Sequence, residues 1–156
     1  MSRSVGILLT CMLLMTACSL KEYLGLSHAN DLSKVSVSST ADCNQNNPVA
    51  YDLVLIFDTG AAATLSTMSA PQWFQQKEAM QLSLGSKIAV LSYDIVPLTS
   101  EQPITLPKNS RDATAVLLFA NYLASLGQVA ARIEGYPSVR IQFEVNQYQI
   151  IAGGKS

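Results

Sequence analysis

The strongest constraint on the fold is a strict alternation of apolar and polar residues near the end of the chain. In the run VRIQFEV, positions 139–145, every odd residue is apolar and every even one is polar. Successive side chains of a strand point to opposite faces, so this run predicts a strand with one face in a core and one in water. A turn at Asn146-Gln147 leads to a second apolar segment, Tyr148–Ala152. The two segments predict a β-hairpin.

Other short segments also have the composition of strands. Residues 34–40 (KVSVSST) alternate, and residues 51–57 (YDLVLIF) are almost continuously apolar, which predicts central burial. Residues 88–98 fit one strand or two short ones, and residues 102–106 fit another. Residues 116–122 (VLLFANY) fit a helix or a buried strand, because a short apolar run does not distinguish them. Short strands separated by turns predict an all-β fold of the sandwich type.

Two connecting segments stand out between these strands. Residues 42–48 (DCNQNNP) are dense in turn-forming residues and predict a loop. The excursion over residues 59–84 is long for a link between strands, and long connections are often functional. Within it, Ser69 can cap a helix that has Pro71 in its first turn and that stops at Gly85. We expect this helix to pack on the sandwich through three buried anchors, Trp73, Phe74 and Met80.

The first eighteen residues have the pattern of an export signal. Arg3 gives a positive start, residues 5–15 (VGILLTCMLLM) are apolar apart from one threonine, and the small residues Thr16 and Ala17 precede Cys18. The apolar run is too short for a membrane span, which needs about 20 residues. Cleavage before Cys18 leaves enough chain for one domain with a core of its own.

The end of this signal, residues 14–18 (LMTAC), resembles the lipobox of bacterial lipoproteins. It matches at the last three positions and departs at Met15, where leucine is usual. The resemblance implies a diacylglycerol and a further acyl chain such as palmitate on Cys18. It also implies sorting to the outer membrane, because Ser19 stands where aspartate signals retention in the inner membrane. Several acyl chains anchor stably, since each buried CH₂ contributes about 0.8 kcal/mol.

These features divide the chain into three expected regions. Residues 1–17 form a lipoprotein signal peptide, residues 18–33 a tether that could include a short helix, and residues 34–152 the β-sandwich domain. After cleavage, Cys43 is the only cysteine besides the acylated one, so no intramolecular disulfide is expected. We expect Cys43 to be a half-buried small residue.

The sequence offers little for several other functions. His28 is the only histidine and no C-x-x-C pair exists, so neither a zinc site nor a Ser-His-Asp triad is expected. The chain has no Walker-type glycine motif for phosphates. Its formal net charge is -1 and it lacks a basic run, which argues against nucleic-acid binding. We therefore expect no cofactor other than the lipid, and no small-molecule substrate.

One catalytic alternative comes from residues 55–61 (LIFDTGA), which resemble the active-site strand and turn of aspartic proteases. In that family the aspartate shares a proton with a second aspartate and activates water. A chain of this length would have to act as a homodimer, as retropepsin-like enzymes do. The resemblance covers seven residues, and the family's flap and supporting glycine segment have no counterpart. The alternative interpretation of Asp58-Thr59-Gly60 is a strand that ends in a turn.

The order of the segments is similar to that in the outer-membrane lipoprotein of type VI secretion systems, the TssJ family. The correspondence begins with the lipobox and runs from residue 35 to about residue 151. The chain departs at residues 129–132 (VAAR), where the family usually has Trp-Arg. The matching pieces are an alternating first strand at 35–38, Asn47-Pro48, a second strand at 53–57, Trp73-Phe74, Leu84-Gly85, Ala120-Asn121-Tyr122 and the last hairpin.

The resemblance implies a transthyretin-like β-sandwich with a short helical insertion, and it makes residues 116–122 a strand. It implies a non-enzymatic protein on the periplasmic face of the outer membrane. This protein would dock the envelope-spanning secretion complex by binding the periplasmic domain of a TssM-like inner-membrane protein. In the family the loop between the first two strands contacts the partner, so the binding candidates are Asn44, Gln45, Asn46 and Asn47. A lipoprotein of a pilus or of another secretion system is the further alternative.

Overall fold

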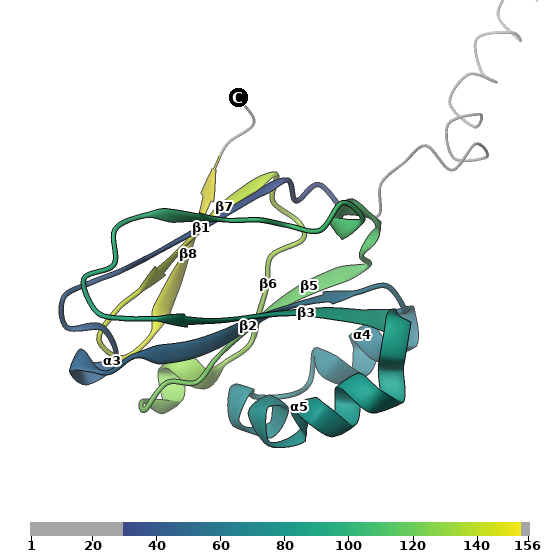
Figure 1. Cartoon of the computed structure of the whole chain (residues 1–156), viewed down its shortest axis with the longest axis horizontal. Helices are drawn as coiled ribbons and strands as arrows, with labels where there is room; N and C mark the ends of the chain where they lie inside the picture. The colour runs from purple at the N-terminus through teal and green to yellow at the C-terminus, as the bar shows by residue number, and fades with distance from the viewer. Residues whose placement is uncertain (1–29, 154–156) are drawn as a thin grey trace, which may run out of the picture.

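A computed structural model describes residues 30–153 of the chain. The predicted signal peptide, Cys18, Ser19, His28 and most of the predicted tether lie outside the described residues. The described part is a sandwich of two four-stranded sheets, with helices on the outer face of one of them (Figure 1). The predicted all-β sandwich is confirmed.

The two sheets differ in how their strands follow the chain. The first has the order β4 (Gln102–Ile104), β1 (Lys34–Ser39), β7 (Ser138–Phe143) and β8 (Tyr148–Gly153). The second has the order β3 (Ile88–Ile95), β2 (Val49–Ile56), β5 (Ala115–Ala120) and β6 (Ala131–Arg132). β1 and β7 run parallel, whereas the other pairs are antiparallel. The chain therefore crosses between sheets several times, which gives the core contributions from both ends of the sequence.

The predicted hairpin is β7 with β8, paired from Ser138↔Gly153 to Phe143↔Tyr148. Val139, Ile141 and Phe143 are buried in the core between the sheets, as the alternation predicts. Val145 differs from the prediction, since 38% of it is exposed. The reason is that β7 ends at Phe143 and the next residues form the turn, closed by the Glu144 N–H on the Gln147 carbonyl at 2.8 Å.

The second predicted strand is the centre of its sheet. β2 lies between β3 and β5, and one of its faces contributes to the core between the sheets while the other packs under the helices. This double burial explains the nearly continuous apolar sequence. Residues 88–95 form one strand rather than two, and residues 115–120 form a strand rather than a helix. Burial on both faces is also the reason that β5 shows no alternation.

The long excursion is helical and covers the outer face of the second sheet (Figure 1). It consists of α4 (Thr59–Leu65), α5 (Ala70–Leu84) and the 3₁₀ turn η1 (Gly85–Lys87). Ser69 precedes α5, and its N–H donates to Gln72 Oε1 at 2.9 Å. Gly85 ends the helix with a φ of 51°, a left-handed conformation that glycine adopts without strain. Nothing in residues 30–153 forms a helix with the length and apolarity that a membrane crossing requires.

The helix anchors follow the sequence prediction in part. Trp73 is fully buried and stacks on Phe119 of β5, with ring centroids 5.0 Å apart. Phe74 and Met80 are only partly buried at the margin of the same cluster. Trp73 therefore packs the excursion onto the sandwich, as expected, and it is not available for a partner.

Candidate interaction surface

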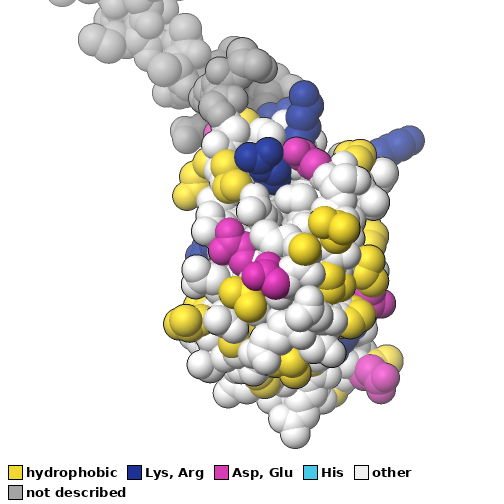
Figure 2. Space-filling view, turned by 90° about the vertical axis from the view of Figure 1, so that its left-hand side faces the viewer, with side chains coloured by type: hydrophobic (Ala, Val, Ile, Leu, Met, Phe, Trp, Pro, Cys, Tyr) yellow, Lys and Arg dark blue, Asp and Glu magenta, His cyan; other side chains and the backbone are white. Residues whose placement is uncertain are grey.

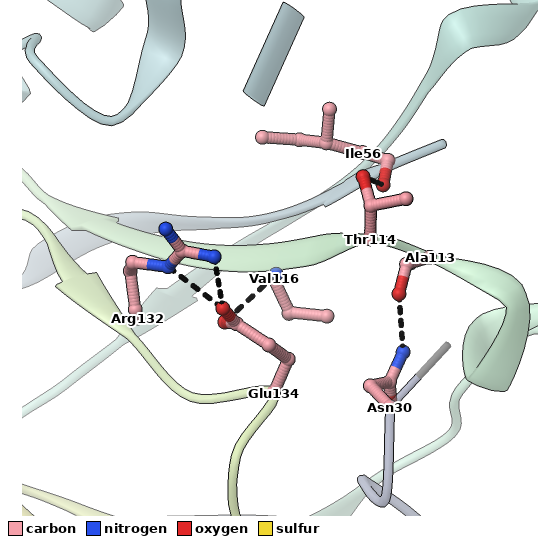
Figure 3. Close-up of polar contacts among 7 residues, drawn as sticks. All are labelled: Asn30, Ile56, Ala113, Thr114, Val116, Arg132 and Glu134. Carbon is pink, nitrogen blue, oxygen red and sulfur yellow. Dashed lines mark hydrogen bonds and ion pairs between the residues drawn. The ribbon is translucent and has the colours of Figure 1, made fainter. Parts of the chain in front are cut away.

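The described chain begins at one end of the sandwich, where polar contacts fix it firmly. Asn30 is buried, and its Nδ2 donates to the carbonyl of Ala113 at 2.7 Å (Figure 3) and also to that of Ser110 at 3.0 Å. Its Oδ1 accepts the N–H of Leu32 at 2.9 Å. Ser110 belongs to the 3₁₀ turn η2 (Ser110–Asp112). We call this the entry end, because here the N-terminal segment joins the domain.

A second polar cluster secures the same region of the sheet. One oxygen of the Glu134 carboxylate accepts the backbone N–H of Val116 at 3.2 Å (Figure 3). The other oxygen accepts Arg132 Nε at 2.7 Å, and the two side chains also form an ion pair. Glu134 thereby satisfies a backbone donor of β5 beyond the two-residue strand β6. The entry end is thus built from internally satisfied polar groups, which suits a support rather than a binding surface.

The opposite end of the sandwich is made of four connecting segments, which we call the loop end (Figure 1). Their ranges are 40–48, 96–101, 121–130 and 144–147. Hydrogen bonds join them to one another: Leu98 N–H to the Thr40 carbonyl at 3.0 Å, Asn44 N–H to the Glu144 carbonyl at 3.0 Å, and the Tyr122 hydroxyl to the Gln147 carbonyl at 2.7 Å. Segments that are far apart in the sequence therefore form one connected surface.

The first of these segments contains a tight left-handed turn. It is labelled α3 (Cys43–Asn46), but Asn44, Gln45 and Asn46 have φ values of 47°, 56° and 63°. For residues other than glycine this conformation costs about 1–2 kcal/mol each, and less for asparagine. Three such residues in succession persist only where the surroundings hold them, and such strain is often found at functional sites. The predicted loop at 42–48 is therefore a fixed turn.

The Asn44 side chain is what holds this turn. Only 2% of Asn44 is exposed, and its Nδ2 donates to the Pro48 carbonyl at 3.0 Å. Its Oδ1 accepts the N–H of Leu123 at 2.9 Å, which ties the turn to the 121–130 segment. Among the four predicted contact residues, Gln45, Asn46 and Asn47 are exposed, whereas Asn44 positions them from beneath. Direct partner contact by these residues stays a prediction.

Cys43 lies directly under the turn. Its thiol is free and the residue is fully buried, so the expectation of a half-buried residue is wrong. The turn folds back over Cys43 because the backbone N–H of this residue donates to the Thr40 carbonyl at 3.2 Å. Burial is the largest cause that raises the pKa of the Cys43 thiol, although a hydrogen bond with Tyr122 opposes it. The buried thiol is thus a packing group rather than a reactive one.

Exposed apolar side chains gather at the same end, and sequence analysis missed them. Nine large hydrophobic residues in the described part of the chain are exposed, and six of them lie in loop-end segments. Figure 2 views this end and shows hydrophobic side chains at several places on it, with acidic side chains between them. The six residues are Val96, Leu98, Leu123, Leu126, Val129 and Val145.

A signal for this surface does exist in the sequence. Residues 121–131 (NYLASLGQVAA) are eleven consecutive residues without a charge, and they include the 3₁₀ turn η3 (Ser125–Gln128). Leu123, Leu126 and Val129 within this run are 62%, 67% and 64% exposed. A loop of this kind usually carries charges, and exposed apolar groups that gather in one place mark interaction sites. They are three positions apart, a spacing that fits one face of a short helix, so the pattern alone does not show that they are exposed.

The Asp58-Thr59-Gly60 segment has a structural role. Asp58 is the N-cap of α4, and its Oδ1 accepts the N–H of Ala61 at 2.8 Å. Lys87 Nζ lies 3.8 Å from the other carboxylate oxygen. Both contacts fit the interpretation of a strand that ends in a helix cap.

Comparison with known proteins identifies the fold but no close relative. The sequence matches no protein family profile and no curated protein. Among solved structures, it is similar to Serratia marcescens Lip, a membrane-bound component of the type VI secretion system, with 10% identity and a TM-score of 0.54. That match covers 81% of this chain and 99% of the other. The type VI lipoprotein TssJ1 from Pseudomonas aeruginosa has 14% identity and a TM-score of 0.55, covering 79% and 96% of the two chains.

A third similar structure is described as the C-terminal domain of the type VI protein TssM from EAEC. It has 11% identity and a TM-score of 0.56, and the match covers 77% of this chain and 97% of that one. Identities this low show the fold alone. The fold is TssJ-like, as the resemblance in the sequence predicts.

Proposed function

We propose that this chain is a lipid-anchored docking protein in the membrane complex of a type VI secretion system, as a divergent relative of TssJ. The observation that carries the proposal is the sandwich itself, which resembles structures from that system over 76–81% of the chain. The lipobox-like residues before Cys18 support it from the sequence alone.

The arrangement of the two ends suits such a role. The N-terminal segment joins the domain at the entry end, where Asn30 is fastened to the sandwich. In our proposal the acyl chains on Cys18 hold the protein at the periplasmic face of the outer membrane, with Ser19 permitting that destination. The loop end lies opposite the entry end (Figure 1), so it would point away from the membrane toward a partner.

The partner that we propose is the periplasmic domain of a TssM-like inner-membrane protein. The loop end offers the two parts that protein interfaces usually combine, an apolar centre and a polar rim. Leu123, Leu126 and Val129 would supply the apolar contacts. The exposed residues of the left-handed turn would supply rim hydrogen bonds, and their fixed backbone lowers the entropy lost on binding.

We propose a structural role rather than a catalytic one. Asp58, the residue on which the protease alternative depends, already accepts the N–H of Ala61 as a helix cap. The Asp58→Ala variant separates the two functions, because it should leave partner binding intact and should abolish any peptide cleavage that depends on this carboxylate.

A binding assay tests the proposed function. The full chain would be titrated with the periplasmic domain of the TssM-like protein encoded in the same gene neighbourhood. We expect the double variant Leu123→Ser/Leu126→Ser to bind at least about ten-fold more weakly, as loss of buried apolar contacts at an interface would cause. The triple variant Gln45→Ala/Asn46→Ala/Asn47→Ala should weaken binding less, because rim contacts contribute little.

A matched control uses exposed residues of the entry end. Lys108→Ala/Asn109→Ala alters side chains that are also exposed but lie at the other end of the sandwich. This variant should bind like the unchanged protein. Binding that is lost in the control but kept in the loop-end variants, or absent from the unchanged protein, would contradict the proposal.

A further inference from the structure

The outer strand β3 has an edge that is regular and that pairs with no other strand within residues 30–153. It pairs with β2 over eight consecutive residue pairs without a bulge, from Val49↔Ile95 to Ile56↔Ile88. Proteins usually protect such edges with lysine, proline, a bulge or a very short strand. β3 (IAVLSYDI) has no lysine, proline or bulge, and its only charged residue is Asp94. By contrast, β4 has three residues including Pro103, and β6 has two.

The pairing with β2 fixes which backbone groups of β3 face outward. The Phe57 N–H donates to the Lys87 carbonyl at 2.8 Å, so residues 57 and 87 form a hydrogen-bonded pair. Such pairs recur at every second residue in an antiparallel ladder. Residues 89, 91, 93 and 95 therefore bond to β2, whereas Val90, Ser92 and Asp94 direct their N–H and carbonyl groups to the free edge. No hydrogen bond among residues 30–153 uses these outward backbone groups.

A groove lies beside this edge, between the two sheets. Its volume is about 270 Å³, and it runs from Tyr93–Val96 at the end of β3 to Gln102–Ile104 in β4. β3 and β4 are edge strands of their two sheets, and both line this groove. Tyr51 and Tyr93, stacked with ring centroids 5.5 Å apart, contribute aromatic surface to the groove. A strand added to β3 would place alternate side chains over this groove.

The charge at this edge is negative. Asp94 is exposed and is the only charged residue of β3, and it forms no ion pair within the described part of the chain. The nearest cation on the adjacent helix, Lys77, is engaged by Asp52 and by the Ser92 hydroxyl. An added strand with Lys or Arg opposite Asp94 would therefore complete a cross-strand ion pair.

We propose that β3 is a docking edge for an extended partner segment that carries a Lys or Arg between apolar residues. The backbone groups of Val90, Ser92 and Asp94 bind the segment as an additional strand, Asp94 selects the cation, and the groove accepts a neighbouring apolar side chain. This site is separate from the turn at 44–47, and its failure would leave the proposed function unaffected.

Amide hydrogen exchange on the full chain, resolved to single residues, tests the proposal with defined probes. The probes are three six-residue peptides of alternating Thr and Val: one with a central Lys, one with a central Glu, and the Lys peptide with N-methylated backbone. In the free chain, the amides of 90, 92 and 94 should exchange faster than those of 89, 91 and 93. The Lys peptide should slow the first set about ten-fold or more, and the methylated peptide should not.

Two variants of the protein separate edge pairing from other effects. Ser92→Pro removes an outward N–H without breaking a bond to β2 and should abolish protection, whereas Ser92→Ala should keep it. The Glu peptide should bind about five-fold more weakly than the Lys peptide, and Asp94→Asn should remove that difference. If Ser92→Pro fails to fold, the methylated peptide and Asp94→Asn still decide the question.

Several results would overturn the proposal. The first is absence of protection in the presence of about 1 mM Lys peptide, because the dissociation constant would then lie well above that concentration. The others are equal protection by the methylated peptide and equal binding of the Lys and Glu peptides. Protection that rises with protein concentration in the absence of peptide would also overturn it, because the occupant of the edge would then be a second copy of the chain.

Discussion

Asp52 is the only charged side chain that is buried within residues 30–153, and two partners explain how it is tolerated. Trp73 Nε1 donates to it at 2.7 Å, and Lys77 Nζ lies 2.9 and 3.0 Å from its two oxygens. Trp73 and Lys77 are four positions apart on α5 and therefore share a face of the helix. One carboxylate in the middle of β2 thus fixes both the position and the rotation of the helix on the sheet.

Removal of the Lys77 ammonium should show how strongly the buried Asp52 carboxylate destabilises the fold when it has no counter-ion. We expect Lys77→Met to lower the free energy of unfolding by about 3 kcal/mol, because it leaves a buried charge without its counter-ion. The double variant Asp52→Asn/Lys77→Met should recover part of the loss. Ser92→Ala is the control, since it removes only the exposed contact of Lys77 and should change stability by less than about 0.5 kcal/mol. Urea denaturation measures all three, and equal stability of Lys77→Met and the unchanged protein would contradict this account.

Two neighbouring residues of the left-handed turn should respond in opposite directions. Asn44→Ala removes the acceptor of Leu123 N–H and the donor to Pro48, so we expect a loss of about 2 kcal/mol in unfolding free energy. Gln45→Gly relieves the strain of a φ of 56° at an exposed side chain and should stabilise by up to about 1 kcal/mol. Thermal unfolding would measure both changes. A destabilised Gln45→Gly variant would contradict the strain assigned to the φ of Gln45, and an unchanged Asn44→Ala variant would contradict the role assigned to Asn44.

At the scale of elements, the sequence predicts those strands and helices that have a regular apolar period or clear start and stop residues. The alternation at 139–145 yields β7, and the turn after it yields the hairpin with β8. Ser69, Pro71 and Gly85 bracket α5 as expected. The pattern could not identify α4, because the small residues after Asp58 have no clear amphipathic period. Residues 116–122 stayed ambiguous without the family resemblance, since β5 is buried on both faces.

The candidate surface was predictable only in part, for a related reason. Its polar half is visible in the sequence as a dense turn at 42–48. Its apolar half consists of single side chains in separate loops, such as Leu98 and Leu126, which only the sandwich topology brings to one end. The structural role of Asn44 was also hidden, because its partner Leu123 lies 79 residues away in the sequence.

The η3 turn contains a glycine that packing requires. A Cβ at Gly127 would lie 2.3 Å from Cγ of Tyr122, a residue whose ring is buried and whose hydroxyl holds the β7–β8 turn. We expect Gly127→Ala to lower the unfolding free energy by about 2 kcal/mol, as overpacking does. Gly135→Ala is the matched control, since nothing lies within 4 Å of its added Cβ. A loss in the control equal to that of Gly127→Ala, measured by thermal unfolding, would refute the packing explanation.

On the scale of the whole molecule, the fold places the fixed polar groups at the entry end and the candidate binding surface at the loop end. The entry end is closed by buried or paired polar groups such as Asn30 and Glu134. The loop end carries most of the exposed apolar residues and a fixed polar turn. In a membrane-anchored protein, this difference between the two ends sets the direction in which the binding surface faces, provided that the anchor is at the N-terminal side.

That condition depends on Cys18 and Ser19, and two substitutions test it. Wild-type cells grown with radioactive palmitate should label the protein, and Cys18→Ser should lose both the label and membrane attachment, because no acyl chain remains to enter the bilayer. Ser19→Asp should keep the label but move the protein to inner-membrane fractions in a density gradient. A wild-type protein without label would refute the anchor, and an unchanged location of a labelled Ser19→Asp variant would refute the assignment of sorting to residue 19. Either result would remove the reason for expecting the loop end to face across the periplasm.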